Sequence, residues 1–241
     1  MILCIKYDNI LKDTNDILNR KVSFMETKGL LYEGTAKKVW KTNDPDLLII
    51  EYKDDIVQKE ENFDTGTMDN RITNYIFRIL EEKGIPTHYV QELSDRETVV
   101  KKVSMLPLEV IVRNVSAGSF KERFGVEEGV ELLCPVVEFR YKNEALKNPW
   151  MNAAIAEAMG IATKEELYKI IQYAGLINET LIEFFAEKEI RLIDFKIEFG
   201  KYKDQIILAD EISPDTCRLW GANTNEKFDK KLLEIKYTHK Q

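Results

Sequence analysis

Charged and apolar side chains alternate in the segment DFKIEF, and this pattern predicts a half-buried β-strand with one charged face. Asp194, Lys196 and Glu198 lie on that face. A polar turn over 200–205 and a second strand then return the chain, so that Asp210 approaches Glu198. Opposed carboxylates on neighbouring strands repel each other by roughly 0.2–1 kcal/mol unless a cation lies between them. Because hard oxygen ligands suit Mg²⁺, the pair predicts a magnesium ion that carries phosphate.

A solvated strand face with screened charges is the alternative interpretation of these acids. The loop that follows them, SPDTCR, argues against it. Pro214 stiffens the turn, and Asp215 and Arg218 stand three positions apart. An arginine in such a loop often binds a carboxylate or a phosphate. An internal Asp215–Arg218 ion pair that only shapes the loop remains the alternative.

The segment VIVRNVSAGSF combines the residue types of an anion site. Arg113, at the end of a predicted buried strand, offers paired N–H donors. Gly118 lets the backbone approach a ligand closely, and Ser119 adds a neutral donor. We expect these residues to bind a phosphate or a carboxylate.

Two weaker patterns fit a nucleotide. LYEGTAKKVW predicts two strands around a turn, where the backbone at Gly34 and the side chain of Lys37 are placed to cover phosphates. An exposed hairpin with two solvated lysines is the alternative. Further on, Lys102 precedes the segment MLPLE, in which backbone groups at 106–108 and the Glu109 carboxylate are placed to contact an adenine edge. An ordinary domain linker is the alternative there.

Neither the histidines nor the cysteines point to catalysis. His88 lies among apolar residues in IPTHYV, which predicts a structural histidine, and His239 lies in the tail. Cys217 has no histidine near it in the sequence and is a poor candidate for a nucleophile. Cys4, Cys134 and Cys217 form no CxxC pair, which argues against a disulfide framework or a zinc site and favours a reducing cytoplasm.

The composition is that of an ordinary globular protein, with 241 residues of which 44% are hydrophobic and 32% are charged. No apolar run reaches the roughly 18 residues of a membrane span, and charges near the start argue against a signal peptide. The net charge of -7 argues against nucleic acid as the main partner. We expect a cytoplasmic protein with small-molecule partners, no nucleic acid, no membrane and a homo-oligomeric assembly.

The predicted elements form two groups. Strands from Gly29 onward indicate an antiparallel sheet, and a helix over 70–83 follows. Pro107 interrupts the next run of strands and predicts a hinge near 105–109. In the second group, Thr163 and Glu166 form a capping box that begins a helix extending to about residue 188. These elements give three expected parts: an N-terminal extension (1–24), a small antiparallel β-rich domain that covers a nucleotide (25–105), and a larger α/β domain with the magnesium and substrate sites (106–241).

Five motifs in this order, LYEGTAKKVW, GIPTHYV, LPLEVIVRNVSAGS, IDFKIEFG and LADEISPDTCRLW, resemble SAICAR synthetase from about Gly29 to Lys230. The resemblance implies an α+β or α/β fold in two parts, with a small antiparallel domain over a larger one. It implies a ligase of purine biosynthesis that depends on ATP and Mg²⁺ and joins L-aspartate to the carboxylate of a phosphoribosyl aminoimidazole. The substrate carboxylate would attack the γ-phosphate to form an acyl phosphate, which the aspartate amine then displaces.

The resemblance also implies a role for each matching residue. Gly34 and Lys37 would lie over the ATP phosphates, Lys102, Glu109 and Lys142 near the nucleotide, and Glu198 and Asp210 at Mg²⁺; Arg113, Ser119, Asp215 and Arg218 would bind the substrate, with Asp194, Lys196 and Arg218 at the reacting groups.

The chain also departs from the family pattern. The unusual residues are Thr35 in the hairpin, Asn148, Ala153 and Ala154 near the expected amine pocket, and Gly221 after RLW. These departures leave two alternatives to the ligase. One is a nucleotide- or phosphate-binding homologue with impaired catalysis, and the other is a related ligase with a different amine substrate.

Overall fold

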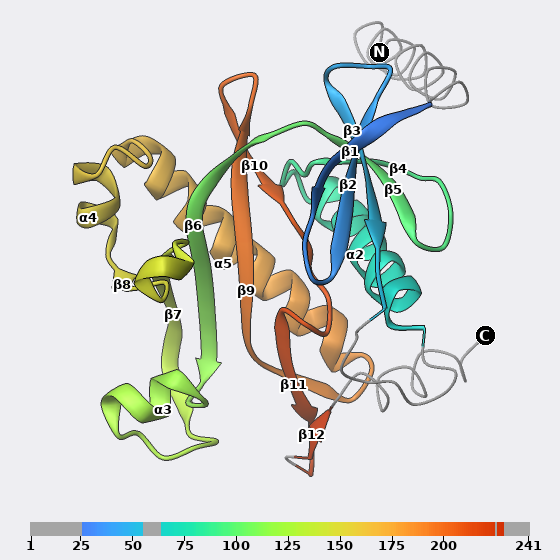
Figure 1. Cartoon of the computed structure of the whole chain (residues 1–241). Helices are drawn as coiled ribbons and strands as arrows, with labels where there is room; N and C mark the ends of the chain where they lie inside the picture. The colour runs from blue at the N-terminus through green and yellow to red at the C-terminus, as the bar shows by residue number, and fades with distance from the viewer. Residues whose placement is uncertain (1–25, 55–63, 225, 229–241) are drawn as a thin grey trace, which may run out of the picture.

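The computed structural model of the chain describes residues 26–54, 64–224 and 226–228. They form two antiparallel sheets with helices packed against them (Figure 1). The fold class predicted from the sequence is confirmed, and α+β is the fitting term because every ladder between strands is antiparallel. The predicted extension over 1–24 and His239 lie outside the described residues.

The small sheet has the strand order β1-β2-β3-β5-β4. Its strands are β1 (Thr27–Glu33), β2 (Lys37–Thr42), β3 (Leu47–Tyr52), β4 (Tyr89–Glu92) and β5 (Glu97–Lys101), and helix α2 (Thr65–Glu82) connects β3 to β4. The apolar side chains of α2 join the core of the larger sheet rather than a separate core.

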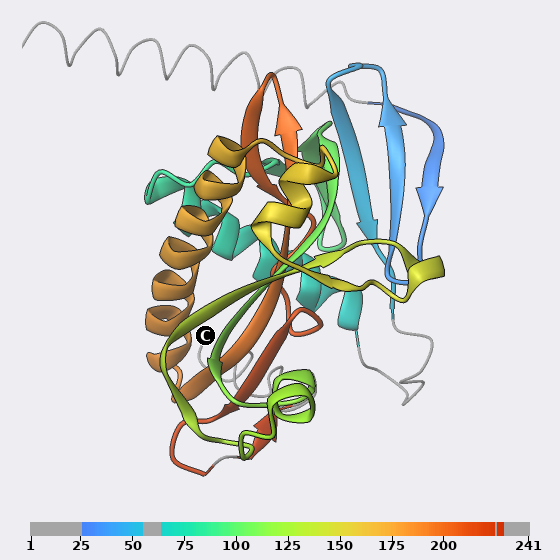
Figure 2. The ribbon, with the colours of Figure 1, turned by 90° about the vertical axis from the view of Figure 1, so that its left-hand side faces the viewer.

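The large sheet has the order β12-β11-β9-β6-β7-β8, and β10 pairs with β9 outside this path. Its strands are β6 (Ser104–Val115), β7 (Glu131–Tyr141), β8 (Trp150–Met151), β9 (Ile190–Tyr202), β10 (Gln205–Ala209), β11 (Cys217–Gly221) and β12 (Lys227–Phe228), and the helices are α3 (Ser119–Phe124), η1 (Glu144–Leu146), α4 (Ala153–Ala158) and α5 (Lys164–Ala186). Helix α5 lies on one side of this sheet and the β1–β2 hairpin lies on the other (Figure 2).

Strand β9 positions the charged face that its sequence predicts. Phe195, Ile197 and Phe199 are buried in the core shared with α2 and α5. Because side chains alternate across a strand, Glu198 lies on the opposite face, beside Ala209 of β10. The predicted turn over 200–205 is too long. The strands continue to a two-residue turn at Lys203 and Asp204, whose φ angles of 47° and 63° are those that tight hairpins require.

Two other boundaries differ from the predictions. Helix α2 begins at Thr65 rather than Asn70, since the Asp64 carboxylate accepts from the Thr67 N–H and caps a first turn of weak helix formers. The predicted break at Pro107 is absent, because β6 runs through it. A register shift against β9 between Met105 and Glu109 accommodates the proline. The sheets change between Lys101 and Ser104, close to the predicted domain boundary, and the division into domains remains a prediction.

The beginning of α5 confirms the predicted capping box, because Thr163 accepts from the Glu166 N–H and the Glu166 side chain accepts from the Thr163 N–H. We expect Thr163→Ala to lower the free energy of unfolding by about 1 kcal/mol, the usual value of such a cap. Urea denaturation of this variant measures the loss, with Thr163→Ser as the control that keeps the hydroxyl. Equal stability of the alanine variant and the wild type would contradict the assignment.

Within the described residues, no helix is both long and apolar enough to cross a membrane.

Candidate active site

The charged face of β9 contributes side chains to two clusters of ionic groups. The first contains the lysines and carboxylates around Glu198 and Asp210. The second contains arginines around Asp194. Lys196 stands between them on the strand and contacts Glu198 at 3.4 Å and Glu109 at 3.9 Å.

In the first cluster each carboxylate has a lysine partner. Lys37 Nζ of β2 lies 2.6 Å from Asp210 Oδ1 and 3.0 Å from Glu211 Oε1. Lys142 follows β7, and its Nζ lies 2.6 Å from Glu198 Oε2. The structure thus brings the two predicted magnesium ligands to one place, together with the predicted phosphate-binding Lys37 from the small sheet.

Burial and charge compete in this cluster. Burial alone would lower the pKa of Lys37, but the Asp210 and Glu211 carboxylates outweigh it and hold the pKa well above its usual value. For Asp210, burial would raise the pKa, whereas Lys37 lowers it to about 2. Burial raises the pKa of Glu211, which shares the same lysine. Asp210 is therefore ionised at neutral pH.

The other residues predicted to contact the nucleotide, Glu109, Lys102 and Gly34, are placed differently from one another. Glu109 is buried, and its carboxylate lies 3.4 Å from Arg140 Nη1. Lys102 has an exposed side chain, and its backbone N–H donates to the Asp46 carbonyl in the turn before β3. Gly34 forms the turn before β2, where its N–H donates to the Lys37 carbonyl.

In the second cluster acids and bases alternate, in the order Arg123, Glu138, Arg113, Asp194 and Arg218. Arg123 Nη2 lies 2.6 Å from Glu138 Oε1, and Arg113 Nε lies 2.6 Å from Glu138 Oε2. Arg113 Nη1 and Arg218 Nη1 each lie 3.0 Å from Asp194 Oδ2. Three cations against two carboxylates leave one positive charge, which suits an anionic ligand.

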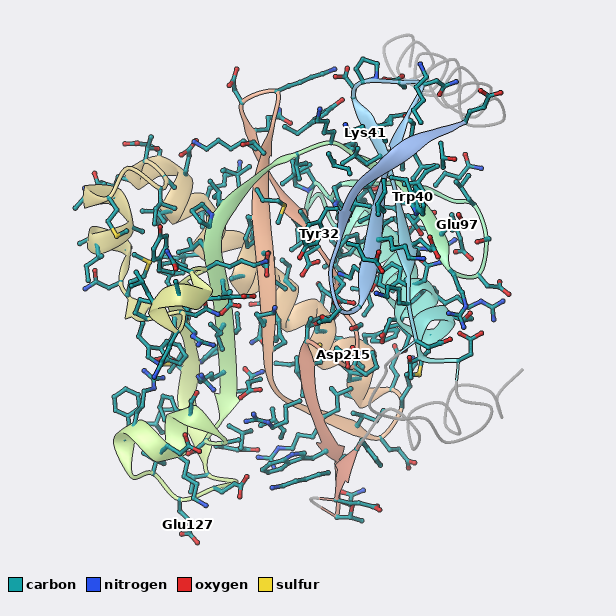
Figure 3. All side chains as sticks on the ribbon, viewed as in Figure 1. Tyr32, Trp40, Lys41, Glu97, Glu127 and Asp215 are labelled. Carbon is teal, nitrogen blue, oxygen red and sulfur yellow. The ribbon has the colours of Figure 1, made fainter. Side chains whose placement is uncertain are left out.

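Ser119 and Asp215 adjoin this cluster. The Ser119 hydroxyl accepts from Arg113 Nη2 at 2.9 Å, which brings two members of the predicted anion site together. Arg218 pairs with Asp194, the partner that the strand register places beside it. Asp215 is exposed in the loop before β11 (Figure 3). Burial raises the pKa of Asp194, although Arg218 and Arg113 oppose the shift.

The sequence interpretation missed Arg123, Glu138 and Trp150. The Trp150 ring lies 3.7 Å from the guanidinium carbon of Arg123 and 5.5 Å from that of Arg113, within cation–π range. The only local signal was that Arg123 follows Ser119 by four residues, which places both on one face of α3. Glu138 and Trp150 reach the cluster through strand pairing, which no local motif reveals.

The unusual residues occupy a loop, the start of a helix and the end of a strand. Asn148 has a φ of 47°, and its side-chain oxygen accepts from the Asn143 N–H at 2.7 Å, which closes the loop before β8. Ala153 and Ala154 form the first turn of α4. At Gly221, an added Cβ would collide with the Thr224 hydroxyl, so glycine suits its position.

Gly118 provides a test of the arginine cluster. Its φ is +48°, and an added Cβ would lie 2.7 Å from Nη2 and 2.9 Å from Nη1 of Arg218. Because Asp194 holds that guanidinium in place, we expect Gly118→Ala to raise the KM for the anionic substrate about tenfold, the effect of roughly 1.4 kcal/mol. Steady-state kinetics measure the change.

The matched control is Gly125→Ala. Gly125 also has a positive φ, +67°, but an added Cβ there would meet nothing within 4 Å. Both variants carry the strain of a positive φ, which is larger at Gly118 because its ψ of -130° lies outside the left-handed helical region that Gly125 occupies, and only Gly118→Ala disturbs Arg218. The same KM in the two variants would contradict a role for Arg218 in binding the anion.

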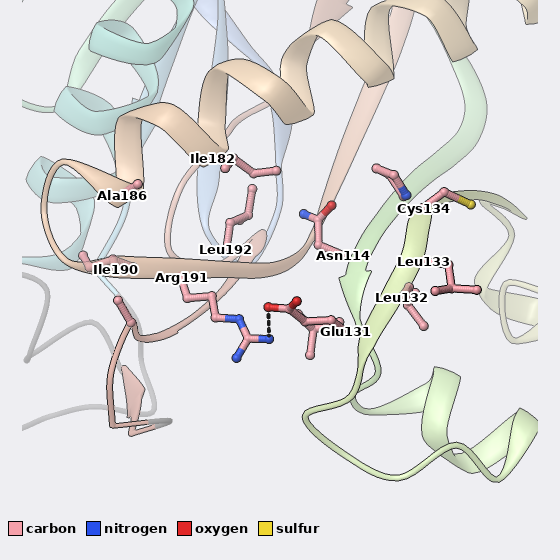
Figure 4. Close-up of a pocket in the computed structure, with 13 residues that line it drawn as sticks. Asn114, Glu131, Leu132, Leu133, Cys134, Ile182, Ala186, Ile190, Arg191 and Leu192 are labelled. Carbon is pink, nitrogen blue, oxygen red and sulfur yellow. Dashed lines mark hydrogen bonds and ion pairs between the residues drawn. The ribbon is translucent and has the colours of Figure 1, made fainter.

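A cavity of about 390 Å³ lies away from both clusters, between the second half of α5 and the starts of β7 and β9 (Figure 4). It is lined mostly by apolar residues, and the Arg191–Glu131 ion pair, at 2.9 Å, lies beside them. Asn114, the residue after Arg113, lines it.

Comparisons with known proteins agree with this geometry. A family model described as SAICAR synthetase matches residues 30–240. The phosphoribosylaminoimidazole-succinocarboxamide synthase of Lachnoclostridium phytofermentans is 57% identical over 205 residues, which cover 83% of this chain and 87% of that protein.

Solved structures show the same fold. The synthase of this name from Ehrlichia chaffeensis superposes with a TM-score of 0.79 at 37% identity, covering 87% of this chain and 92% of that one. A SAICAR synthetase in complex with ADP superposes with a TM-score of 0.77 at 42% identity, covering 87% and 91%. The chain therefore belongs to the SAICAR synthetase family, ATP-dependent ligases of purine biosynthesis.

Proposed function

We propose that this chain joins the amine of L-aspartate to the carboxylate of 5-amino-1-(5-phosphoribosyl)imidazole-4-carboxylate, with conversion of ATP to ADP and phosphate. The observation that carries the proposal is the charged face of β9. It has carboxylates that suit a metal–nucleotide complex at Glu198 and an arginine cluster that suits a phosphate ester at Asp194, with Lys196 between them. A ligase that transfers phosphate to a bound substrate needs these two sites side by side.

The nucleotide belongs at the first cluster. The relative solved with ADP supports nucleotide binding in this fold. Lys37 and the turn at Gly34 would contact the phosphates, and Glu109, Lys102 and Lys142 would lie toward the rest of the nucleotide. Lysines and backbone N–H groups are the donors that usually hold phosphate oxygens.

The donor set of the first cluster fits Mg²⁺. Glu198 and Asp210 supply hard carboxylate oxygens, and the neighbouring Glu211 Oε2 is buried without a hydrogen-bond partner among the described residues. No group of three or more His, Cys, Asp or Glu side chains is spaced for a metal in the described part of the chain. Two protein carboxylates, with phosphate oxygens from the nucleotide, are therefore the proposed ligands. When bound, the ion would neutralise phosphate charge.

The substrate belongs at the second cluster. Arg113, Arg218 and Ser119 would hold its phosphate, with Asp215 nearby. Asp194 would then face the aminoimidazole, and Lys196 would stabilise negative charge as the substrate carboxylate approaches the γ-phosphate. A carboxylate oxygen forms a bond to phosphorus while the bond to ADP breaks. The amine then attacks the acyl carbon, phosphate leaves and the amine loses a proton.

The direct test is incubation of the protein with ATP, Mg²⁺, the aminoimidazole carboxylate and L-aspartate, followed by assays of ADP and the amide product. The proposal predicts product only when aspartate is present. ADP binding without turnover would instead indicate the impaired homologue, and ADP release with another amine would indicate a different substrate.

We also propose a cytoplasmic, homo-oligomeric enzyme. Cys134 and Cys217 are both free thiols, which fits a reducing compartment.

A further inference from the structure

Residues 210–216 connect β10 to β11, and we call them the acidic loop. The loop begins with Asp210 and Glu211, which both contact Lys37, at 2.6 Å and 3.0 Å. In a regular strand, the side chains of consecutive residues point to opposite faces. Asp210 breaks the strand with a φ of +62°, in the left-handed region that a non-glycine residue adopts only where its surroundings hold it there. The path of the backbone through the loop therefore decides where both carboxylates lie.

Both ends of the acidic loop are fixed by hydrogen bonds. Before the loop, Ala209 is paired with Glu198 of β9. Toward its end, the Ser213 N–H donates to the Thr216 hydroxyl and the Thr216 N–H donates to the Ser213 carbonyl, each at 3.0 Å. The Thr216 carbonyl accepts from the Lys196 N–H of β9 at 2.8 Å. The first three residues of the loop lie between these two anchors.

Thr73 of helix α2 holds this part of the loop from the side. Thr73 is 2% exposed, and its hydroxyl donates to the Ile212 carbonyl at 3.1 Å, in a buried hydrogen bond between residues 139 positions apart. The Ile212 side chain is buried in the core to which α2 contributes. The bonded carbonyl belongs to the residue directly after Glu211.

The hydrogen bond of Thr73 differs from the usual one of a threonine inside a helix. Such a hydroxyl commonly donates to the carbonyl four residues earlier in its own helix. Thr180 of α5 does so, at 2.9 Å from the Leu176 carbonyl. Thr73 instead reaches out of its helix to the acidic loop. Loss of its hydroxyl would take this donor from a buried carbonyl, which is costly and favours a shift of the loop.

We propose that Thr73 is a positioning residue, whose hydrogen bond to the Ile212 carbonyl fixes the backbone of the acidic loop and thereby keeps the Asp210 carboxylate directed at the metal–nucleotide complex. This inference rests on the proposed function of Asp210 and adds a residue of α2, outside the two clusters. Thr73 acts through the loop rather than on the reacting groups.

The test measures how strongly Mg²⁺ and ADP favour each other's binding. Calorimetry gives the ADP affinity of the full chain with EDTA and with saturating Mg²⁺. Thr73→Val keeps the branched shape of the side chain and removes the hydroxyl. We expect it to lose about tenfold of the Mg²⁺-dependent gain in ADP affinity. The affinity in EDTA should stay within about threefold, because the small sheet carries Lys37.

Three further variants separate positioning from stability. Thr73→Ser keeps the hydroxyl and should keep the gain from Mg²⁺. Thr180→Val removes a hydroxyl from a threonine that is also buried, 4% exposed, but bonded within its own helix. It should lower the melting temperature and keep the gain. If Thr73→Val does not fold, Thr73→Ala replaces it.

The outcomes distinguish this inference from the proposed function. A wild type in which Mg²⁺ has no effect on ADP affinity would overturn both. A wild type that makes product and shows the gain, beside a Thr73→Val protein with the same gain, would overturn only the role of Thr73. An equal loss of the gain in Thr180→Val would also overturn that role, because reduced stability alone would then explain the loss.

Discussion

Glu198→Gln is expected to remove turnover while the protein stays folded. The carboxylate is 1% exposed, and we propose it as a direct ligand of Mg²⁺. Replacing a residue that only hydrogen-bonds a metal ligand lowers activity by about 10–100-fold. Replacing the ligand itself should therefore lower kcat by more than about 100-fold. Release of ADP measures the rate, and thermal unfolding measures the fold.

The fold should survive because of where the lysine partners lie. The side chains of Lys142 and Lys196 are 48% and 35% exposed, so both can turn to water when the glutamate loses its charge. Asp210→Asn should also abolish turnover, but with a larger loss of stability. Its partner Lys37 is only 12% exposed, and after the substitution Glu211 would be the one carboxylate still paired with that lysine among the described residues.

The matched control is Glu166→Gln. Glu166 pairs with Lys201, also on β9, at 2.7 Å and lies outside both clusters. Its kcat should equal that of the wild type. Near-normal turnover by Glu198→Gln would reject the metal assignment.

Arg113→Lys should raise the KM for the phosphoribosyl substrate by roughly 100-fold, which corresponds to the loss of one or two hydrogen bonds to charged groups. Arg113 contacts Glu138, Asp194 and Ser119 at once. Lysine keeps the charge but lacks the planar fork that makes these contacts together. Initial rates at varied substrate concentration measure the change.

Two measurements accompany this variant. The ADP affinity should be unchanged, because Lys37 and Asp210 belong to the other cluster. Arg191 lies on β9 and pairs with Glu131 beside the cavity. Arg191→Lys should therefore leave the substrate KM and the ADP affinity unchanged. Weaker ADP binding by Arg113→Lys, with a normal substrate KM, would contradict the division into two sites.

The sequence alone predicted the parts of the site that depend on local patterns. Strict alternation around Glu198 and the return strand to Asp210 follow from the two-residue period of a strand. The capping box at Thr163 depends on four consecutive residues. The motif from Arg113 to Ser119 placed two residues of the predicted anion site within seven positions, and their side chains are hydrogen-bonded in the structure.

The missed features depend on contacts between distant segments. Lys37 and Asp210 are 173 positions apart, and no local pattern reveals that the lysine is buried against that acid. Glu138 and Trp150 reach the arginines only through the pairing of β7 with β6 and β8. The strand through Pro107 needed a register shift that depends on β9, since proline by itself indicates a break.

A crystal of the protein grown with ADP and Mn²⁺ in place of Mg²⁺ tests whether Glu198 and Asp210 hold the metal. We predict an anomalous peak bound by carboxylate oxygens of Glu198 and Asp210 and by phosphate oxygens of ADP. Bound ADP with the manganese peak elsewhere, and with these two side chains turned away from the phosphates, would contradict it.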